Sequence, residues 1–351
     1  MRIGVPTEIK IQEGRVALIP EACAELITHG HKVFLQAGAG RLSGYPDEAY
    51  SKQGVQIVPD AAELYASAEL IIKVKEPQPA ELAYLTSEHR LFSYLHLAAE
   101  PALLSSLLEI GLTAIAFETV GNGHALPLLA PMSDIAGRLA VHIGTTLLHL
   151  HHGGRGLLLG GIPAAERGRV VILGAGIAGG NACAVAQAMG ANVTIFDPNR
   201  QKQALMRELG ANVTALHPYP AAIDEHIQTA DLLIGAVLIP GAKAPYLVSE
   251  QQVRGMQPGS VIVDIAVDQG GCIATTRPTN YADPTYIWSD VVHFAVTNMP
   301  GAVPRTASQA LSAVLVPYIL RLTQSDWASD EELNRGLNVQ AGQIILPALK
   351  N

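Results

Sequence analysis

The sequence has few cysteines, few aromatic residues and few charges for its length. Its three cysteines, Cys23, Cys183 and Cys272, are spread over 351 residues and form no CxxC pair. An odd and scattered set of this kind argues against a disulfide-stabilised secreted fold and is typical of free thiols in a reducing cytoplasm. No stretch rich in Lys and Arg accompanies the net charge of -8. We therefore expect no nucleic-acid partner.

Signals for membranes and secretion are also weak. The N-terminal stretch "MRIGVPTEIK" lacks the long apolar region of a signal peptide. Residues 170–196 form a run of 27 residues without a charge, but five glycines, Asn181, Gln187 and Asn192 interrupt it. Because the hydrophobic periodicity changes within the run, we interpret it as strand, turn, helix and strand rather than as a membrane span. We expect a soluble, cytoplasmic protein.

The chain is rich in apolar residues (49%) and in glycine (33 residues), which is typical of a packed α/β protein. Strand-like and helix-like runs alternate, which predicts βαβ units and an α/β fold of two doubly wound, Rossmann-like domains with mostly parallel sheets. Long helices should join them, including residues 132–154, and Pro317 should kink a helix near the C-terminus. The predicted strands are 2–6, 32–36, 55–58, 69–75, 90–96, 112–118, 169–174, 191–197, 231–237, 260–268 and 291–298, and the predicted early helices are 20–29, 60–66, 79–86 and 100–110.

The most informative stretch is "RVVILGAGIAGG", where Gly174, Gly176 and Gly179 form GxGxxG directly after a predicted strand. The first glycine permits the tight turn, the second lets a pyrophosphate approach the backbone, and the third allows close helix–strand packing. The helix that follows offers unpaired N–H groups to the phosphates. Asp197, 21 residues after Gly176, ends the next predicted strand. Its carboxylate suits the ribose hydroxyls of NAD, while Arg200 keeps NADP as the second choice.

Polar residues near the ends of predicted strands are candidates for chemistry, because ligands of open α/β sheets bind outside the carboxyl ends of the strands. His96, Lys75 and Asp268 close three predicted strands, and Arg15 follows the first strand in "QEGR". Two cations, an imidazole and a carboxylate would bind an acid substrate and move protons. The alternatives are a core histidine at His96, solvated charges at Arg15 and Lys75, and turn or capping roles for Asp264 and Asp268.

A cluster of histidines precedes "GG" at the end of the long central helix. His149, His151 and His152 are crowded there without a matching carboxylate pattern. We interpret them as exposed residues rather than as metal ligands.

Motifs along nearly the whole chain resemble those of the NAD-dependent L-alanine dehydrogenase family. They are "RIGVPTEIK…EGRVAL", "KVKEP", "YLHLAA", "LPLLAPMS", "GGRG", "GAGIAG", "IGAVLIPGAKAP", "VDIAVDQGG" and "TNMPGAVPRTA". The resemblance implies that Arg15 and Lys75 hold the substrate, that His96 is the acid/base group, and that Asp268 orients or activates water and ammonia. Asn298 would line the site beside the nicotinamide. The implied NAD contacts are Ser133, Gly174, Ala175, Gly176, Ile177, Ala178, Gly179, Asp197, Lys202, Val237, Leu238, Ile265, Asp268, Asn298 and Met299.

The resemblance also implies an organisation for the chain. Residues 1–130 and 306–351 would form the catalytic domain, residues 131–305 the NAD-binding domain, and the assembly would be a homo-hexamer. Two stretches depart from the family. Where relatives often carry serines near the adenosine, this chain reads "LHPYPAA". Some relatives pair a glutamate matching Glu118 with a C-terminal histidine around a divalent metal, but this chain has Gln340 in "LNVQAG". We therefore expect no metal.

Three activities compete on these grounds. The main prediction is the reversible oxidative deamination of L-alanine to pyruvate and ammonia. The second is the nucleotide-binding part of a proton-translocating transhydrogenase, a module for a membrane partner, which shares "RIGVP" and the glycine loop but lacks a histidine matching His96. The third keeps the dehydrogenase fold and uses a larger amino acid, as saccharopine dehydrogenases do.

Overall fold

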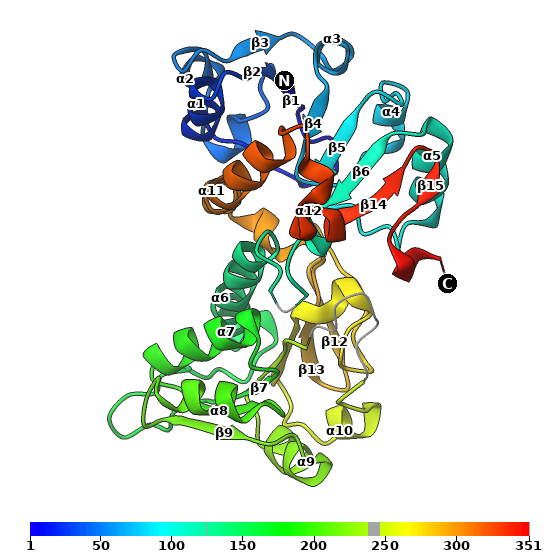
Figure 1. The fold of residues 1–351 in the computed structure, drawn as a ribbon. Helices are drawn as coiled ribbons and strands as arrows, with labels where there is room; N and C mark the ends of the chain where they lie inside the picture. The colour runs from blue at the N-terminus through cyan, green and yellow to red at the C-terminus, as the bar shows by residue number, and fades with distance from the viewer. Residues whose placement is uncertain (124, 238–245, 351) are drawn as a thin grey trace. The chain divides into compact units, whose positions relative to one another are not determined.

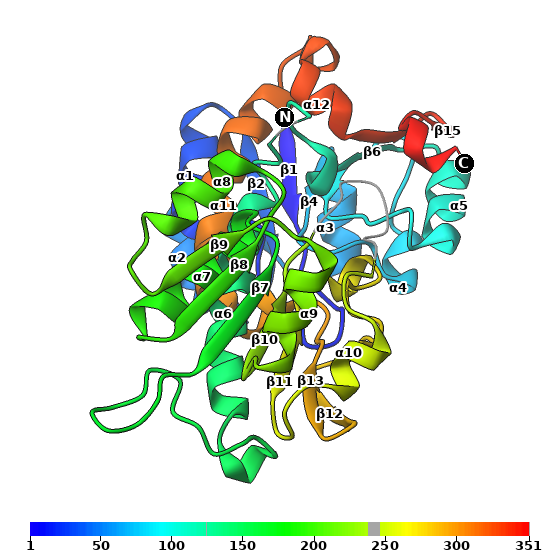
Figure 2. The ribbon, with the colours of Figure 1, turned by 90° about the horizontal axis from the view of Figure 1, so that it is seen from below.

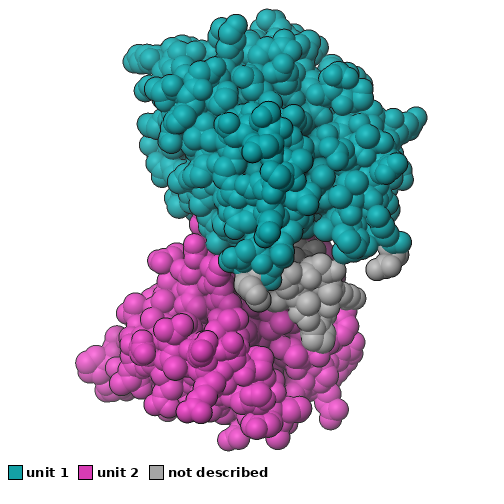
Figure 3. Space-filling model, in the orientation of Figure 1, with its two compact units in different colours: residues 1–132, 301–351 teal, residues 133–300 magenta. Residues whose placement is uncertain are grey.

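The computed structural model describes residues 1–123, 125–237 and 246–350. Among these residues the chain forms two compact units, which Figure 3 distinguishes by colour. Unit 1 contains Met1–Met132 and Gly301–Asn351, and unit 2 contains Ser133–Pro300. Each unit is described by itself below.

Unit 1 is built on an eight-stranded sheet with the order β15-β14-β6-β5-β4-β1-β2-β3 (Figure 1). Strands β1 to β6 are parallel to one another, and the C-terminal strands β14 and β15 extend the same sheet beyond β6 in antiparallel fashion. The strands are β1 (Arg2–Val5), β2 (Lys32–Gln36), β3 (Gln56–Val58), β4 (Leu70–Ile72), β5 (Arg90–Ser93), β6 (Thr113–Ala116), β14 (Leu337–Gln340) and β15 (Gln343–Ile344). The helices are α1 (Pro20–Thr28), α2 (Asp47–Ser51), α3 (Ala61–Ser67), α4 (Pro79–Leu82), α5 (Pro101–Ile110), α11 (Pro304–Leu322) and α12 (Glu331–Gly336).

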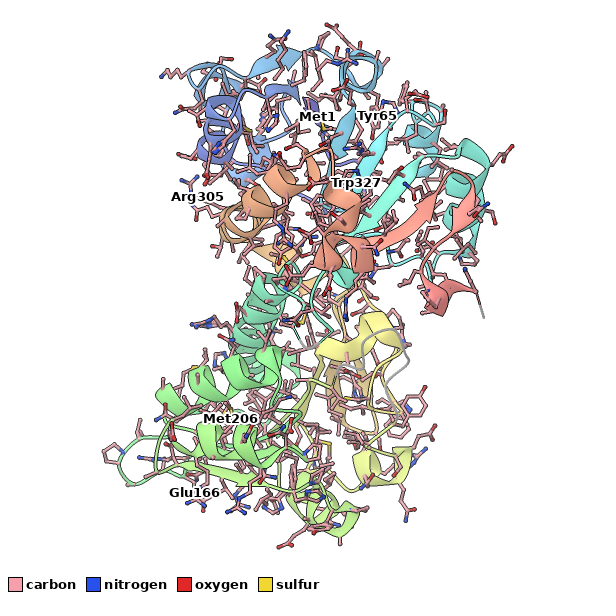
Figure 4. All side chains as sticks on the ribbon, in the orientation of Figure 1. Met1, Tyr65, Glu166, Met206, Arg305 and Trp327 are labelled. Carbon is pink, nitrogen blue, oxygen red and sulfur yellow. The ribbon has the colours of Figure 1, made fainter. Side chains whose placement is uncertain are left out.

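Apolar side chains from α3 and α5 pack on one face of this sheet, where Leu64 and Leu107 join Leu91 in a buried cluster. Helix α11 is tied to the segment that follows β1, because the Ser308 hydroxyl accepts the Val16 N–H at 2.9 Å. Near the end of α11 the Arg90 guanidinium lies over the ring of Trp327, 5.3 Å from its centroid (Figure 4 labels Trp327). These contacts join the C-terminal segment to the first strands of the chain.

Unit 2 is built on a seven-stranded sheet with the order β12-β13-β11-β10-β7-β8-β9, which Figure 2 shows from below. Only β12 is antiparallel to its neighbour among the strands described. The strands are β7 (Arg169–Leu173), β8 (Asn192–Phe196), β9 (Val213–Leu216), β10 (Leu232–Gly235), β11 (Val261–Asp264), β12 (Thr285–Trp288) and β13 (Val291–Phe294). The helices are α6 (Ala130–Leu147), whose first turn belongs to unit 1, α7 (Ile177–Ala188), α8 (Arg200–Arg207), α9 (Pro220–Gln228) and α10 (Glu250–Arg254).

Both faces of the unit 2 sheet are covered by helices. Val170 and Ile172 of β7 belong to a core cluster with residues of α6 and α7. Val171, the residue between them, belongs to a second cluster with residues of α9 and α10. Alternate side chains of a strand point to opposite faces, so both faces of β7 are buried. This double covering explains the charge-free sequence of residues 170–196, which forms strand, loop, helix and strand as predicted.

The predicted fold class is therefore confirmed: the chain is an α/β protein with two mostly parallel sheets. Several predicted strands end earlier than expected, since β4 ends at Ile72, β5 at Ser93 and β11 at Asp264. Helix α11 runs from Pro304 to Leu322 with Pro317 inside it. In the part of the chain that the structure describes, no helix has the length and apolar character that crossing a membrane requires.

Candidate active site

His96 lies three residues beyond β5 in a left-handed backbone conformation, with φ 48°. Its side chain is 36% exposed, and its ring stacks on Tyr94 with an interplanar angle of 9°. A core histidine of this chain looks different: the His89 ring is buried, its Nδ1 accepts the Thr86 N–H, and its Nε2 donates to the Tyr65 carbonyl. The core interpretation of His96 is therefore wrong, and the imidazole is presented to solvent from a strained turn.

Glu118 holds this turn. Its Oε1 accepts the His96 N–H at 2.6 Å and the Leu95 N–H at 3.2 Å. The same oxygen lies 3.9 Å from Nδ1 of His96. Glu118 follows β6, the neighbour of β5, in a short 3₁₀ turn (η2, Phe117–Thr119). One carboxylate thus satisfies two backbone donors that would otherwise lack partners after the strand ends.

Arg15 is buried, with 2% of its surface exposed, and is paired with a carboxylate that sequence reasoning missed. Its Nε donates to Oε1 of Glu13 at 2.7 Å, and its Nη2 donates to Oε2 at 2.5 Å. Burial opposes the positive charge, but the hydrogen bonds and charge of Glu13 outweigh it and raise the pKa of Arg15. The interpretation as a solvated charge is wrong. This bidentate pair fixes the plane of the guanidinium.

Lys75 is also buried (9% exposed) and not a solvated charge. It lies beyond the end of β4, although the ladder to β5 continues through a bond from the Tyr94 N–H to the Val74 carbonyl at 3.1 Å. Its Nζ is 3.7 Å from Oε2 of the buried Glu76. Burial alone would raise the pKa of Glu76, but Lys75 and the hydrogen bond from Lys10 lower it. The carboxylate is therefore charged beside the ammonium group.

Tyr94 and Glu8 contact His96 and the backbone of Lys75. The Tyr94 ring stacks on His96. Burial raises the pKa of Tyr94, and the charge of Arg15 opposes that shift. Glu8 accepts the Lys75 N–H at 3.4 Å. Burial raises the pKa of Glu8, with Lys73 opposing and Glu13 adding to the shift. Arg15, Lys75 and His96 come after the carboxyl ends of three adjacent parallel strands, β1, β4 and β5.

In unit 2 the glycine loop has the geometry that GxGxxG predicts. Gly174 has φ 96°, and a Cβ on Gly179 would lie 1.8 Å from the Gly174 carbonyl oxygen. A Cβ on Gly176 would meet no atom within 4 Å. The first and third glycines are therefore required by the turn and by packing, whereas the second leaves open space for a ligand at the N-terminus of α7. The residues fit a dinucleotide pyrophosphate.

Asp197 follows β8 and is 6% exposed. Its Oδ2 accepts the Ala175 N–H at 2.8 Å, and its Oδ1 accepts the Asn199 N–H at 2.8 Å. Nζ of Lys202, from the first turn of α8, is 3.9 Å from Oδ2. The acid therefore stands directly beside the glycine loop and also holds it, which is a role that sequence reasoning missed.

The other residues expected to contact NAD lie around the carboxyl ends of neighbouring strands. Val237 follows β10 and packs beside the glycine loop, since a Cβ added to Gly174 would lie 3.2 Å from its Cγ2. Ser133 precedes Asp134, whose side chain accepts a hydrogen bond from Asn181 of α7 at 2.7 Å. Asn298 follows β13 with φ 62°. Ile265 begins the turn after β11. Met299 is held by the Tyr281 hydroxyl, which donates to its carbonyl at 2.8 Å. The remaining contacts, Ala175, Ile177 and Ala178, lie in the glycine loop and the first turn of α7.

Two predicted residues fall outside what the structure describes. Leu238 lies in residues 238–245, and the side chain of Asp268 is not described, although its backbone belongs to a 3₁₀ turn (η4, Ile265–Gln269). Asp264 is buried and caps this turn, since its Oδ1 accepts the Ala266 N–H at 3.0 Å. Burial raises the pKa of Asp264. The capping interpretation of Asp264 is confirmed.

The histidine cluster and Gln340 provide no metal-binding set in the described part of the chain. No group of three or more His, Cys, Asp or Glu residues there is arranged to hold an ion. His151 and His152 are exposed and His149 is half-buried in a short turn after α6. The Glu118 carboxylate is engaged by backbone N–H groups.

A glycine loop with a neighbouring strand-end acid in one unit, and two buried cations and an imidazole after adjacent strands in the other, define a two-unit nucleotide-binding α/β oxidoreductase. Residues 4–136 match the family model described as alanine dehydrogenase/PNT, N-terminal domain, and residues 140–347 match the C-terminal domain model of that family. The chain belongs to the alanine dehydrogenase/PNT family.

Individual relatives agree with this assignment. The chain is 47% identical to alanine dehydrogenase of Bacillus subtilis over 99% of its length and 94% of the relative. A solved structure of an L-alanine dehydrogenase covers 100% of this chain and 98% of its own, at 48% identity and a TM-score of 0.95. A transhydrogenase structure from Sinorhizobium meliloti covers 99% of this chain and 100% of its own, with 26% identity and a TM-score of 0.86.

Proposed function

We propose that the chain is an NAD-dependent L-alanine dehydrogenase, which converts L-alanine and water to pyruvate and ammonia, and catalyses the reverse reaction. The observation that carries the proposal is that Arg15, Lys75 and His96 follow three adjacent parallel strands of unit 1, with both cations buried and the imidazole accessible. Two buried cations suit the carboxylate and carbonyl oxygens of a 2-oxo acid, and an accessible imidazole suits proton transfer near neutral pH.

Arg15 binds the substrate carboxylate in this proposal, and Glu13 keeps its guanidinium in plane. Lys75 binds the carbonyl oxygen or the amino end. A buried acceptor stands next to it: among the described residues, Oε2 of Glu76 has no hydrogen-bond partner and lies 3.7 Å from Lys75 Nζ. A buried acceptor without a partner is open to a donor that a bound ligand brings. The ammonium group of alanine is such a donor.

His96 moves the protons. In the oxidative direction the Cα hydrogen leaves alanine as hydride, water adds to the imine carbon, and the carbinolamine loses ammonia. The amino group first gives up a proton to solvent, so departure of the hydride leaves an iminium ion. His96 takes a proton from the attacking water and passes it to the nitrogen. As the carbinolamine collapses, its hydroxyl proton goes to His96 and on to the departing ammonia, so the imidazole returns to its starting charge. Asp268, which follows β11, orients the water and ammonia in this proposal, and Asn298 lines the nicotinamide end.

NAD supplies the hydride acceptor when bound. Gly174–Gly179 and the N-terminus of α7 hold the pyrophosphate, and Asp197 binds the ribose hydroxyls. Ser133, Lys202, Val237, Leu238, Ile265 and Met299 complete the proposed contacts. We also propose that the protein is a cytoplasmic homo-hexamer that degrades alanine. Its catalytic domain would consist of residues 1–130 and 306–351, and its NAD-binding domain of residues 131–305. No metal takes part in the proposal.

The transhydrogenase alternative receives less support, because that structure is 26% identical and the alanine dehydrogenase structure 48%. The deciding experiment measures NADH oxidation with ammonia and pyruvate, 2-oxobutyrate or glyoxylate as the second substrate. We expect turnover to be fastest with pyruvate and to require ammonia. Turnover that favours a larger 2-oxo acid, or NADH oxidation that is independent of ammonia, would contradict the proposal.

A further inference from the structure

Two exposed rings stand together immediately after β9. The ring centroids of His217 and Tyr219 are 4.5 Å apart, with an interplanar angle of 49°. Tyr219 is 65% exposed. Single exposed apolar groups are common on protein surfaces, but a pair of rings that are held together and left uncovered offers a stacking surface.

The backbone holds this pair in place. The Tyr219 N–H donates to the His217 carbonyl at 2.8 Å, which closes a three-residue turn around Pro218. Pro220 then begins α9, with Tyr219 as its N-cap residue. Prolines on both sides of Tyr219 fix two backbone φ angles, so little conformational entropy is lost when a ligand packs on the ring.

The rings also lie next to the proposed ribose site. β9 pairs with β8, with Leu216 opposite Phe196, and the Asp197 N–H donates to the Leu216 carbonyl at 3.1 Å. His217 therefore follows directly from the residue that is bonded to Asp197. The glycine loop approaches Asp197 from β7, the other neighbour of β8. A nucleotide with its pyrophosphate on the loop and its ribose on Asp197 carries its base within reach of the turn after β9.

We propose that His217 and Tyr219 form a stacking platform for the adenine of the dinucleotide. The proposal rests on the proposed NAD dependence and adds a contact for the adenine base. A heteroaromatic base presents a flat π-face, and stacking on an aromatic side chain requires no matched hydrogen bonds. Removal of the Tyr219 ring should therefore weaken binding of every ligand that contains adenosine diphosphate and spare ligands that lack adenine.

The test compares Tyr219→Ala and Tyr219→Phe with the parent protein. NADH is titrated by its fluorescence, and ADP-ribose and nicotinamide mononucleotide are titrated by calorimetry. We expect Tyr219→Ala to raise the Kd of NADH and ADP-ribose about tenfold, as for the loss of one stacked ring. The Kd of nicotinamide mononucleotide should not change, and Tyr219→Phe, which keeps the ring, should behave like the parent. His217→Ala should weaken the same two ligands.

Tyr84→Ala is the control, because Tyr84 is a partly exposed tyrosine (39%) of unit 1 whose ring neighbours Tyr65. It should leave every Kd unchanged. If Tyr219→Ala binds NADH and ADP-ribose like the parent, the platform is refuted. That holds as well if the variant changes the oligomeric state, because the rings would then face another copy of the chain and not the adenine. If the parent itself binds no NADH, the proposed function fails instead. Melting temperatures check that each variant is folded.

Discussion

The carboxylate of Glu118 accepts the backbone N–H of His96 over 2.6 Å, while His96 has a left-handed φ of 48°. Such a conformation in a residue other than glycine costs on the order of 1 kcal/mol and persists only where neighbours enforce it. Here the enforcement comes from a different strand end, since Glu118 follows β6 and His96 follows β5. The geometry of the proposed proton donor therefore depends on an acid that need not touch the substrate.

The first prediction concerns Glu118. In Glu118→Ala two backbone donors, those of Leu95 and His96, lose their acceptor, and the imidazole is no longer held. We expect kcat to fall at least about tenfold, because a misplaced catalytic group slows the reaction. The free energy of unfolding should fall as well, since an unsatisfied buried donor costs about 1–3 kcal/mol. NADH binding should not change.

Glu118→Gln retains one acceptor oxygen, so its kcat should lie between those of Glu118→Ala and the parent. The control is Glu69→Ala, which removes another carboxylate that accepts a backbone N–H, that of Arg2, at the amino end of the sheet. An equal loss in both variants would contradict a specific role.

The second prediction concerns His96 itself. His96→Gln should fold, bind NADH like the parent and lose on the order of 100-fold in kcat, as expected for a missing acid/base group. Thermal melting and turnover in both directions provide the measurement. His89→Gln is the matched control, because His89 is buried with both ring nitrogens hydrogen-bonded. That variant should lose stability more than activity. A His96→Gln protein within about tenfold of the parent in kcat would remove His96 from the mechanism.

The third prediction concerns the pair of Arg15 and Glu13. Arg15→Lys cannot reproduce the two parallel bonds to Glu13, so the cation loses its orientation and the buried carboxylate loses a partner. We expect kcat/KM for alanine to fall about 100-fold while the Kd of NADH stays the same. Glu13→Gln should lower kcat/KM in the same direction, since the guanidinium is then no longer held by a charge. Parent-like kinetics in Arg15→Lys would show that Arg15 does not bind the substrate.

The fold class and the glycine loop were predictable because both depend on local patterns. A charge-free strand followed by GxGxxG and a strand-end acid specifies a turn, and the φ of 96° at Gly174 follows from that turn. Four strands were missed: the parallel edge strand β9, and β12, β14 and β15, which pair in antiparallel fashion. β12 and β13 form a hairpin through Ser289 and Asp290, both with positive φ, where glycine or asparagine is the usual signal.

The charge partners in the candidate site could not be predicted in the same way. Glu13 and Glu76 lie within two residues of Arg15 and Lys75 in the sequence, which is a visible signal, but their burial depends on packing across several strands. Glu118 and His96 are separated by a strand and a helix, and their bond exists only because β5 and β6 are neighbours. Long-range pairing of this kind leaves no periodicity in the sequence.

The fourth prediction concerns cofactor choice. The charge of Asp197 should repel a 2′-phosphate, so the parent should bind NADH more tightly than NADPH. Asp197→Asn removes the charge and keeps one oxygen that can accept the Ala175 N–H of the loop. We expect it to lower the ratio of the NADPH Kd to the NADH Kd about tenfold. Asp231→Asn is the control, since Asp231 also accepts a backbone N–H, that of Arg169, but at the amino end of the sheet. Equal or tighter NADPH binding by the parent would contradict the role of Asp197.

The fifth prediction concerns acid stability and Asp330, which caps α12 and receives two bonds of 2.6 Å from Arg321. Burial opposes ionisation, but the Arg321 hydrogen bonds and the Leu333 N–H outweigh it and hold the pKa of Asp330 below its usual 3.8. A carboxyl whose pKa is lower in the folded state stabilises the fold above the usual pKa and loses that contribution as the pH falls through the lowered value. Asp330→Ala should therefore lower the free energy of unfolding by about 1–2 kcal/mol at neutral pH, the contribution of a cap plus a partly screened ion pair.

Denaturant unfolding across pH provides the measurement, and the difference in free energy of unfolding between variant and parent should shrink below about pH 4. Asp326→Ala is the control, because Asp326 begins the preceding turn (η6, Trp327–Ser329) without capping it through its side chain. A constant Asp330→Ala difference down to pH values below the lowered pKa would mean that the carboxylate contributes nothing through its charge.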